Sequence, residues 1–355
     1  MEPIQISFFG ATNSGKSSLV NAIAGQSVSL VSDLPGTTTD PVRKRMEIPG
    51  IGPCVLVDTA GYGDKGELGS QRERLTKAVI DSTHIAVLIR SGHPADSEWE
   101  SMLTSAGIPV VPITQGADRD VVLEQITSSF QKEQETFLTG SLVKKGDVVV
   151  LVMPQDSEAP GGRIILPQVQ VLRELLDRAC IPVCCLPEQL SKTLESLKEP
   201  PALVITDSQV FRQVNDMIPT GWPLTSFSVL LAAAKGDIRI FSEGAKAIDK
   251  LRERDRILIA EACTHVPNTE DIGRVKIPAL LRKRIPGLQV TVAGGKDFPE
   301  DLSDYNLIIH CGACVASARL VKSRIKKALQ AGVPITNYGI AIAYLQGILE
   351  RISFP

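Results

Sequence analysis

The chain has few aromatic residues and no long apolar run, and its charges nearly balance. Phe, Trp and Tyr make up 4% of the 355 residues, and the formal net charge is −2. A nucleic-acid binder normally carries a basic excess, and a single-strand binder needs aromatic side chains on which bases stack. No stretch approaches the roughly 18 apolar residues that a membrane-spanning helix requires. The composition therefore predicts no nucleic-acid partner and no membrane span.

The seven cysteines are odd in number and do not have the spacing of a disulfide scaffold. The first residues include the polar Glu2 and Gln5 and lack the apolar region of a secretory signal. Thiols without such a signal are typical of a reducing compartment. We therefore expect a cytoplasmic protein.

A complete phosphate-binding motif lies near the start. The apolar residues of segment 4–9 run into Gly10-Ala-Thr-Asn-Ser-Gly15-Lys16-Ser17, and apolar residues at helical spacing follow. In a strand, loop and helix context, backbone N–H groups of such a loop surround a phosphate. Lys16 then reaches the β- and γ-phosphates, and the Ser17 hydroxyl ligates Mg²⁺.

Two further segments are typical of the switches of a GTPase. The apolar residues 55–57 end in Asp58, which is placed to hold Mg²⁺, and the Gly61 N–H can reach a γ-phosphate. Residues 35–40 form a loop in which Thr38 offers a hydroxyl to the metal. The predicted catalytic residues are Lys16, Thr38, Asp58 and Gly61, and the predicted Mg²⁺ ligands are Ser17, Thr38 and Asp58.

Asn13, together with the Gly-Thr-Thr-Thr run at 36–39, resembles the potassium-activated GTPases of the translation-factor class. In that class the Asn helps to bind a K⁺ that replaces an arginine finger. Where the class reads guanine with Asn-Lys-x-Asp, this chain has Gln115-Gly-Ala-Asp118, and only the carboxylate of Asp118 is kept. Guanine selectivity is therefore left open. The predicted nucleotide-binding residues are Gly10, Asn13, Ser14, Gly15, Lys16, Ser17, Ser18 and Asp118.

Cys263-Thr-His265 and His310-Cys311-Gly-Ala-Cys314 place three thiols and two imidazoles in two short clusters. Each cluster follows an apolar run, so both should lie at the carboxyl ends of strands, where ligands collect in open α/β sheets. Three Cys and one His would suit a zinc site, whereas three thiolates beside an open position would suit an iron-sulfur cluster. The residues by themselves indicate a metal centre without naming the metal.

From residue 147 onward, strands and helices alternate, which predicts parallel sheets with crossover helices. The first of these sheets is small and should expose an edge, so we expect this part of the chain to form a homodimer by edge pairing. The chain as a whole is expected to be an α/β protein of three domains, at residues 1–137, 138–222 and 223–355.

Segments along nearly the whole chain, among them GATNSGKSS, APGGRIILPQVQ, LIAEACTH, LIIHCGAC and GVPITNYGIAIAY, resemble the maturation GTPases of FeFe-hydrogenases, the HydF family. The resemblance implies a P-loop GTPase domain, shorter here than is usual, a dimerisation domain and a C-terminal [4Fe-4S] domain. By motif position the cluster would be held by Cys263, Cys311 and Cys314, with His265 and His310 as candidate fourth ligands.

The resemblance also implies a function. Proteins of this family hydrolyse GTP, use Mg²⁺ and K⁺, and act as scaffold and carrier for the diiron subcluster, a precursor with CO and CN ligands. The implied partners are two radical-SAM maturases (HydE and HydG) and the apo-hydrogenase (HydA).

Two alternatives stand beside this reading. One is a ribosome- or RNA-associated small GTPase with a structural zinc, which the balanced charge and sparse aromatics disfavour. The other is a cluster carrier whose nucleotide domain is weakly active and does not select its base.

Overall fold

The structure is a computed structural model that describes residues 3–25, 42–63, 67–130, 137–155, 164–262, 271–295, 297–314 and 316–355. The chain divides into two compact units, Met1–Gln134 and Glu135–Pro355. Both alternate strands and helices, which confirms the expected α/β class. Within the second unit, the expected boundary at residue 222 stays a prediction.

The first unit is built on a five-stranded sheet of order β2-β3-β1-β4-β5, in which only β2 runs antiparallel to its neighbour. Apolar side chains project from both faces, as expected for a sheet that helices cover on both sides. Its strands are β1 (Ile4–Gly10), β2 (Val42–Ile48), β3 (Gly52–Asp58), β4 (Ile85–Arg90) and β5 (Val110–Thr114). Its helices are α1 (Lys16–Ala24), α2 (Glu67–Ile80), α3 (Asp96–Ser105) and α4 (Arg119–Ser129).

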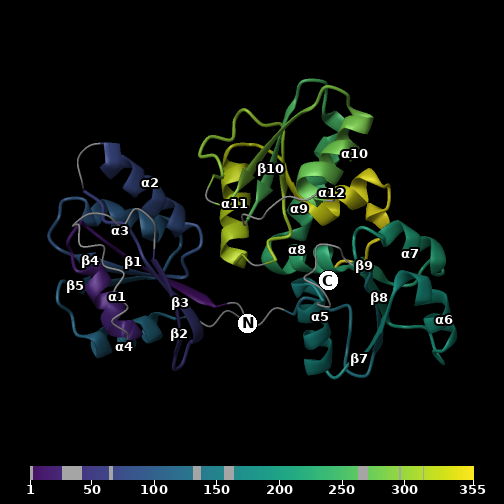
Figure 1. Ribbon diagram of the computed structural model, residues 1–355, viewed down its shortest axis with the longest axis horizontal. Helices are drawn as coiled ribbons and strands as arrows, with labels where there is room; N and C mark the ends of the chain where they lie inside the picture. Colours follow the sequence, from purple (N-terminus) through teal and green to yellow (C-terminus); the bar gives the residue numbers. More distant parts are fainter. Residues whose placement is uncertain are drawn as a thin grey trace. The chain divides into compact units, whose positions relative to one another are not determined.

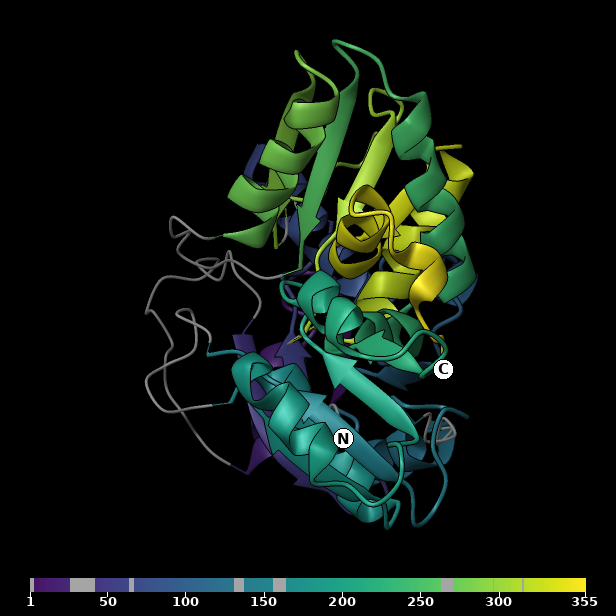
Figure 2. The same cartoon turned by 90° about the vertical axis from the view of Figure 1, so that its right-hand side faces the viewer.

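The second unit contains two four-stranded sheets, both wholly parallel. The strands are β6 (Val148–Val152), β7 (Ile181–Cys185), β8 (Leu203–Thr206), β9 (Leu224–Ser226), β10 (Arg256–Glu261), β11 (Gln289–Gly294), β12 (Leu307–His310) and β13 (Ile335–Asn337). The α-helices are α5 (Leu166–Asp177), α6 (Leu190–Glu195), α7 (Phe211–Met217), α8 (Phe227–Lys235), α9 (Ile238–Ala245), α10 (Ile277–Arg284), α11 (Ala318–Gln330) and α12 (Tyr338–Leu345). A π-helical turn, Ile272–Lys276, precedes α10. The two sheets lie at opposite ends of the unit, with α8 and α12 between them (Figures 1 and 2).

The two sheets of the second unit repeat one another. Their strand orders are β7-β6-β8-β9 and β11-β10-β12-β13. The first, second, third and fourth strands along the chain therefore take the same places in both sheets. Before the first strand of each sheet, an Asp side chain accepts the same backbone hydrogen bond: Lys144 N–H to Asp147 Oδ2 and Arg252 N–H to Asp255 Oδ2, both 2.8 Å. An internal structural repeat, which the sequence analysis did not recognise, therefore builds this unit.

The repeat extends to the sequence at its carboxyl end. Residues 223–236 (PLTSFSVLLAAAKG) and 334–347 (PITNYGIAIAYLQG) each form a short strand and the helix that follows it. The two helices, α8 and α12, also contact each other at equivalent positions, because a Cβ added to Gly339 would lie 2.2 Å from Ser228 Oγ. Contact between equivalent residues is what an approximate twofold axis between the two repeats produces.

Candidate functional site

The phosphate-binding loop joins β1 to α1. Asn13 and Gly15 have left-handed φ values of 63° and 90°, a conformation that helps a loop to turn its N–H groups inward around an anion. The Lys16 side chain is buried, and its Nζ donates to the carbonyl oxygens of Gly10 at 3.0 Å and Ala11 at 2.8 Å. The ammonium therefore lies across the loop. The structure brings together here the predicted residues Gly10, Asn13, Ser14, Gly15, Lys16, Ser17 and Ser18.

Asp58 ends β3 directly beside β1, where it pairs with Phe8 in the parallel register. Burial raises the pKa of Asp58, while a hydrogen bond from the Ser17 hydroxyl and the charge of Lys16 oppose this shift. Its Oδ1 atom is buried and has no hydrogen-bond partner among the described residues. Carboxylate and hydroxyl oxygens are donors that Mg²⁺ prefers, so Ser17 and Asp58 fit this ion. Thr38 lies outside the described residues, and its contact with the metal stays a prediction.

Gly61 lies against the phosphate-binding loop. A Cβ at this position would be 2.6 Å from the Thr12 Cα, so only glycine fits here. The next residue, Tyr62, accepts a hydrogen bond from Thr12 N–H at 3.0 Å, stacks on Trp99 with ring centroids 4.8 Å apart and donates its hydroxyl to Asp96 at 2.7 Å. The segment that follows β3 is therefore joined both to the loop and to α3. The sequence analysis did not single out Tyr62.

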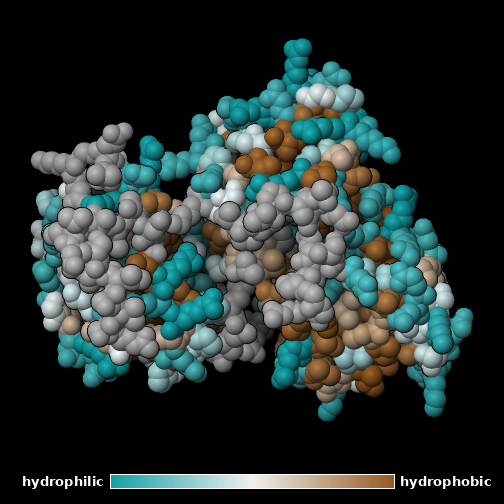
Figure 3. All heavy atoms as spheres, viewed as in Figure 1, coloured by the Kyte–Doolittle hydropathy of each residue, from teal (hydrophilic) through white to brown (hydrophobic). Residues whose placement is uncertain are grey.

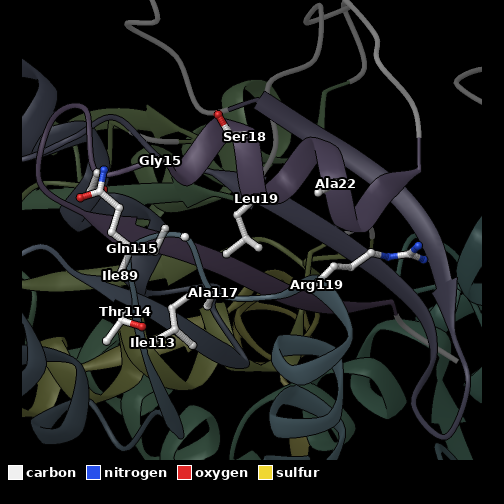
Figure 4. A pocket seen from close by; sticks show the side chains of 12 residues that line it. Gly15, Ser18, Leu19, Ala22, Ile89, Ile113, Thr114, Gln115, Ala117 and Arg119 are labelled. Carbon is white, nitrogen blue, oxygen red and sulfur yellow. The ribbon is translucent and has the colours of Figure 1, made fainter.

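A pocket of about 330 Å³ adjoins the loop (Figure 4). It is lined by Ser14, Gly15, Ser18, Leu19, Ala22, Ile89, Ile113, Thr114, Gln115, Gly116, Ala117 and Arg119. Gln115 and Arg119 lie on opposite sides of it, with Leu19 between them (Figure 4). The pocket lies next to the phosphate-binding loop and is lined by the 114–117 loop. It is therefore the candidate base pocket.

In the structure Asp118 caps a helix, and its role as a base reader stays a prediction. It is the N-cap of α4, and its Oδ1 accepts the N–H groups of Asp120 at 2.8 Å and Val121 at 3.5 Å. Asp118 also does not line the pocket. A short acidic side chain immediately before a helix is a strong capping signal, and that signal competes with the interpretation as a base reader.

Each cysteine-containing cluster follows a strand, as predicted, and the structure shows that these two strands are neighbours. β10 and β12 pair in parallel with Ala260 opposite His310, and Cys311 N–H donates to Ala260 O at 2.9 Å. In this sheet the chain turns from β10 to β11 on one side and then crosses to β12 on the other. The ends of β10 and β12, and with them Cys311 and Cys314, therefore lie at the topological switch point, where ligands bind in open α/β sheets. Cys263 and His265 lie outside the described residues.

The Cys311 sulfur is surrounded by backbone donors. Its Sγ accepts the N–H of Ala262 at 3.1 Å and of Ala313 at 3.4 Å. Ala262 is the residue before Cys263, so the chain contacts Cys311 immediately before the first cluster. The left-handed φ of 50° at Ala313 turns the loop back toward Cys311, and N–H donors directed at sulfur favour the thiolate form. Cys311 and Cys314 therefore fit a thiolate-bound metal group.

Lys235 also holds the loop that contains Cys311 and Cys314. Its side chain is buried at the end of α8, and Nζ donates to the carbonyl oxygens of Ala313 at 2.7 Å, Cys314 at 3.2 Å and Ala316 at 2.9 Å. The helix that follows this loop, α11, begins at Ala318. Lys235 was missed because nothing in a lysine at a helix end indicates a partner 79 residues further along the chain.

His310 is engaged within the fold. It is 1% exposed, its Nδ1 lies 2.7 Å from Cys311 O, and its Nε2 lies 3.1 Å from the Arg324 guanidinium. Burial and the Arg324 charge lower the pKa of His310 to about 4, so the ring is neutral, donates from Nδ1 and accepts at Nε2. Since both ring nitrogens are used, this geometry does not support His310 as the candidate fourth ligand.

Arg324 is buried, although its helix, α11, carries several basic residues. Its side chain is 1% exposed, and it donates to Glu261 O at 3.1 Å and Gly295 O at 2.8 Å. Arg324 thereby joins the carboxyl ends of β10, β11 and β12. The sequence does contain a signal for this burial, because Arg324 lies three residues after Val321 and next to Ile325, on the buried face of the helix.

Within the described part of the chain, no three His, Cys, Asp or Glu side chains form a group that could hold a metal ion, and two of the predicted cluster ligands, Cys263 and His265, lie outside that part. The same residues include no helix that is both long and apolar enough to cross a bilayer.

Three family models match the chain. They are a 50S ribosome-binding GTPase over residues 5–115, the hydrogen maturase F dimerization domain over 138–236 and the hydrogen maturase F tetramerization domain over 239–354. The last two together span more than half of the chain and contain both of its repeats.

Curated relatives match the first unit. The tRNA modification GTPase MnmE of Nitrosomonas europaea is 40% identical over 29% of this chain and 23% of its own length. GTPase Der of Caldicellulosiruptor saccharolyticus is 37% identical over 29% of this chain and 24% of its own length. The chain thus spans about a quarter of the length of these relatives. Era of Aquifex aeolicus bound to GDP and AlF₄⁻ aligns over 84% of this chain and 97% of its own, with 15% identity and a TM-score of 0.28.

Proposed function

Because the chain belongs to the hydrogen maturase F family, we propose that it is a GTP-hydrolysing scaffold on which the diiron subcluster of FeFe-hydrogenase is assembled and from which it is carried to the apo-enzyme. The observation that carries this proposal is the loop after β12 that contains Cys311 and Cys314, called the thiol loop from here on. It lies at the β10–β12 switch point, and backbone N–H groups are directed at Cys311 Sγ. A phosphate-binding loop with Mg²⁺ donors accompanies it on the same chain.

The thiol loop would hold a [4Fe-4S] cluster through Cys311, Cys314 and Cys263. When bound, such a cluster supplies one iron without a thiolate, which can exchange ligands. His265 is the remaining candidate for that position, since His310 is occupied by Arg324 and by its own backbone. Lys235 and the N–H donors to Cys311 keep the loop in position before any metal enters.

The first unit would hydrolyse GTP. Water attacks the γ-phosphorus, the bond to the β–γ bridging oxygen breaks with its electron pair leaving on GDP, and the proton of the water ends on phosphate. Lys16 would neutralise the phosphates, Ser17, Asp58 and Thr38 would hold Mg²⁺, and the Gly61 N–H would contact the γ-phosphate. We expect the rate to be slow and K⁺ to raise it through Asn13, whose side chain is exposed.

The capping role of Asp118 favours a nucleotide domain with weak base selectivity. A carboxylate that accepts two N–H groups of α4 is turned to its helix, and the pocket is lined instead by Gln115 and Arg119. GTP remains the proposed substrate on the strength of the family, with discrimination against ATP lower than an Asn-Lys-x-Asp element gives.

The β7 edge would form the dimer. The outer edge of β9 is covered, because Ser353 N–H donates to Leu224 O at 2.7 Å, whereas β7 ends its sheet with Ile181 55% exposed. Figure 3 shows hydrophobic atoms gathered over the region of α5 and β7. The exposed apolar residues there are Ile164, Leu166, Val169, Leu176 and Ile181. An apolar edge of this kind is a template for pairing with a second copy.

The further partners would be the two radical-SAM maturases and the apo-hydrogenase, in a reducing cytoplasm where thiols remain available. GTP hydrolysis would regulate association with these partners.

Anaerobic reconstitution with iron and sulfide tests the scaffold proposal. We expect about four irons and four sulfides per chain, lost in Cys263→Ala, Cys311→Ala and Cys314→Ala. The control is Cys184→Ala, which removes an exposed thiol of β7 and should keep the cluster. One zinc per chain without iron-sulfur absorbance would instead indicate a structural zinc site and contradict the proposal.

A further inference from the structure

The two repeats of the second unit differ in one hydroxyl at equivalent positions. Phe227 and Tyr338 are each the first residue of the helix after the last strand of their sheet. Phe227 is 1% exposed and packs in an apolar core. Tyr338 keeps the ring and adds an O–H group, so the fold needs the ring at this position in both repeats and the hydroxyl in only one.

The Tyr338 hydroxyl makes no hydrogen bond within the part of the chain that the structure describes, although its oxygen is buried. Burying a hydroxyl without a partner is unfavourable, and buried polar groups are almost always paired. Tyrosine stands here where phenylalanine fits, and its hydroxyl is unpaired among the described residues, so a bound group is a candidate partner.

The surroundings of the hydroxyl identify where that partner lies. A Cβ on Gly273 would lie 1.9 Å from the Tyr338 hydroxyl oxygen, so the π-helical turn has a glycine where the hydroxyl approaches it. π-helical turns are frequent at functional sites. Burial raises the pKa of Tyr338, and the nearby Cys311, Glu261 and Asp271 raise it further. The hydroxyl thus stays protonated, and it lies at the carboxyl end of the sheet that also presents the thiols.

The neighbouring carboxylates already have donors. Glu261 binds Arg274 through Nε at 3.2 Å and through NH2 at 2.7 Å. Asp271 accepts the Arg274 N–H at 2.7 Å. Tyr338 bonds to neither of them. The nearby Cys311, whose charge acts on Tyr338, makes sulfur a further candidate acceptor.

We propose that the Tyr338 hydroxyl donates a hydrogen bond to the sulfur-bearing group held by Cys311 and Cys314. This inference rests on the proposed function, in which that group is a [4Fe-4S] cluster. A hydrogen bond to cluster sulfur stabilises the reduced form, which carries one more negative charge, and so raises the reduction potential. Tyr338 would therefore shift the cluster toward its reduced, more negatively charged form, and with it the charge next to the bound diiron precursor.

Tyr338→Phe in the full-length chain is the direct test, because Phe227 shows that this side chain fits the position. After anaerobic reconstitution, iron and sulfide content should equal that of the unmodified chain. At a fixed ambient potential, the ratio of reduced to oxidised cluster, read by electron paramagnetic resonance, should fall roughly three- to tenfold, a tenfold change corresponding to 59 mV for one electron. The thermal midpoint of the metal-free protein should stay the same or rise.

Tyr344→Phe is the matched control. It removes a hydroxyl from the other end of α12, where the partner is Asp249 at 2.5 Å. We expect no change in the cluster ratio. If the unmodified chain forms no cluster, the proposed function fails at that step. If Tyr338→Phe binds the cluster and keeps the same ratio, the inference is wrong while the function stands. A lower thermal midpoint of metal-free Tyr338→Phe with an unchanged ratio would assign the hydroxyl a structural role and also overturn the inference.

Discussion

The Arg324 guanidinium lies 3.1 Å from His310 Nε2, and both side chains are 1% exposed. The pair joins α11 to the end of β12, immediately before Cys311. Because Arg324 also binds carbonyl oxygens at the ends of β10 and β11, one buried cation fixes the three strand ends around the candidate metal centre. The predictions below begin with this pair.

Arg324→Met should destabilise the metal-free protein by about 3 kcal/mol, because buried carbonyl oxygens lose their charged donor. It should also increase the rate at which Cys311 reacts with a thiol reagent, since the loop is no longer held. Chemical denaturation and thiol titration measure the two effects. The control is Lys322→Met on the exposed face of the same helix. Equal stability of the two variants would contradict the prediction.

His310→Asn should retain the cluster. The Asn side chain keeps an N–H close to the position of Nδ1, which can still donate to Cys311 O, while the loss of the Arg324 contact should cost about 1–3 kcal/mol of stability. Iron content per chain checks this expectation. An iron content as low as that of Cys314→Ala would show that His310 is a ligand after all.

Gly273→Ala should destabilise the second unit by about 1–3 kcal/mol, because the added Cβ meets the Tyr338 hydroxyl. Combining it with Tyr338→Phe should recover part of the loss, since the hydroxyl is then absent. Equilibrium unfolding of the four proteins gives the coupling. Gly312→Ala, with no atom within 4 Å of its added Cβ, is the control. Strict additivity would mean that the two residues do not meet.

Asp118→Ala should lower the free energy of unfolding of the first unit by about 1 kcal/mol, as the loss of a helix N-cap does. GTP affinity, measured by isothermal titration, should change less than about threefold, because the carboxylate is turned to α4. Asp118→Ser, which preserves the cap, should restore stability. A loss of GTP affinity above about tenfold in both variants would identify Asp118 as a base reader.

Ile181→Lys should shift the protein toward the monomer, because a charge on the open edge of β7 opposes pairing with a second copy. Sedimentation velocity across micromolar concentrations measures the shift. The control is Leu329→Lys, which removes a side chain of equal exposure, 55%, from α11. A monomer for the unmodified chain at every concentration would disprove the edge-paired dimer.

Much of the fold could be predicted from residues that are close together in the sequence. Apolar residues followed by the glycine-rich loop predicted β1, the loop and α1, because a phosphate-binding loop requires that order of elements. The apolar run before Asp58 predicted β3 in the same way. The strands before the two cysteine clusters were predicted from apolar runs, together with the rule that ligands collect at the carboxyl ends of parallel strands, and the structure added that the two strands pair.

Side-chain roles that depend on distant partners were not readable. His310 was predicted as a ligand candidate, because nothing in the sequence shows that Arg324 lies beside it. Asp118 fits both a base-reading element and a helix N-cap, and the structure shows it as the N-cap of α4. The internal repeat was missed because its identities are few, and it became visible through the common strand order and equivalent backbone hydrogen bonds.

The sequence by itself determined the α/β class, the phosphate-binding loop and the thiol clusters, since each depends on residues within one turn or strand and its loop. Only the tertiary structure decided that Ala262 meets Cys311, that Arg324 is buried beside His310 and that the Tyr338 hydroxyl has no hydrogen-bond partner among the described residues. These relationships arise from packing between elements far apart in the chain. The free energy of burying a charge or a hydroxyl is set by that packing and not by the neighbouring residues in sequence.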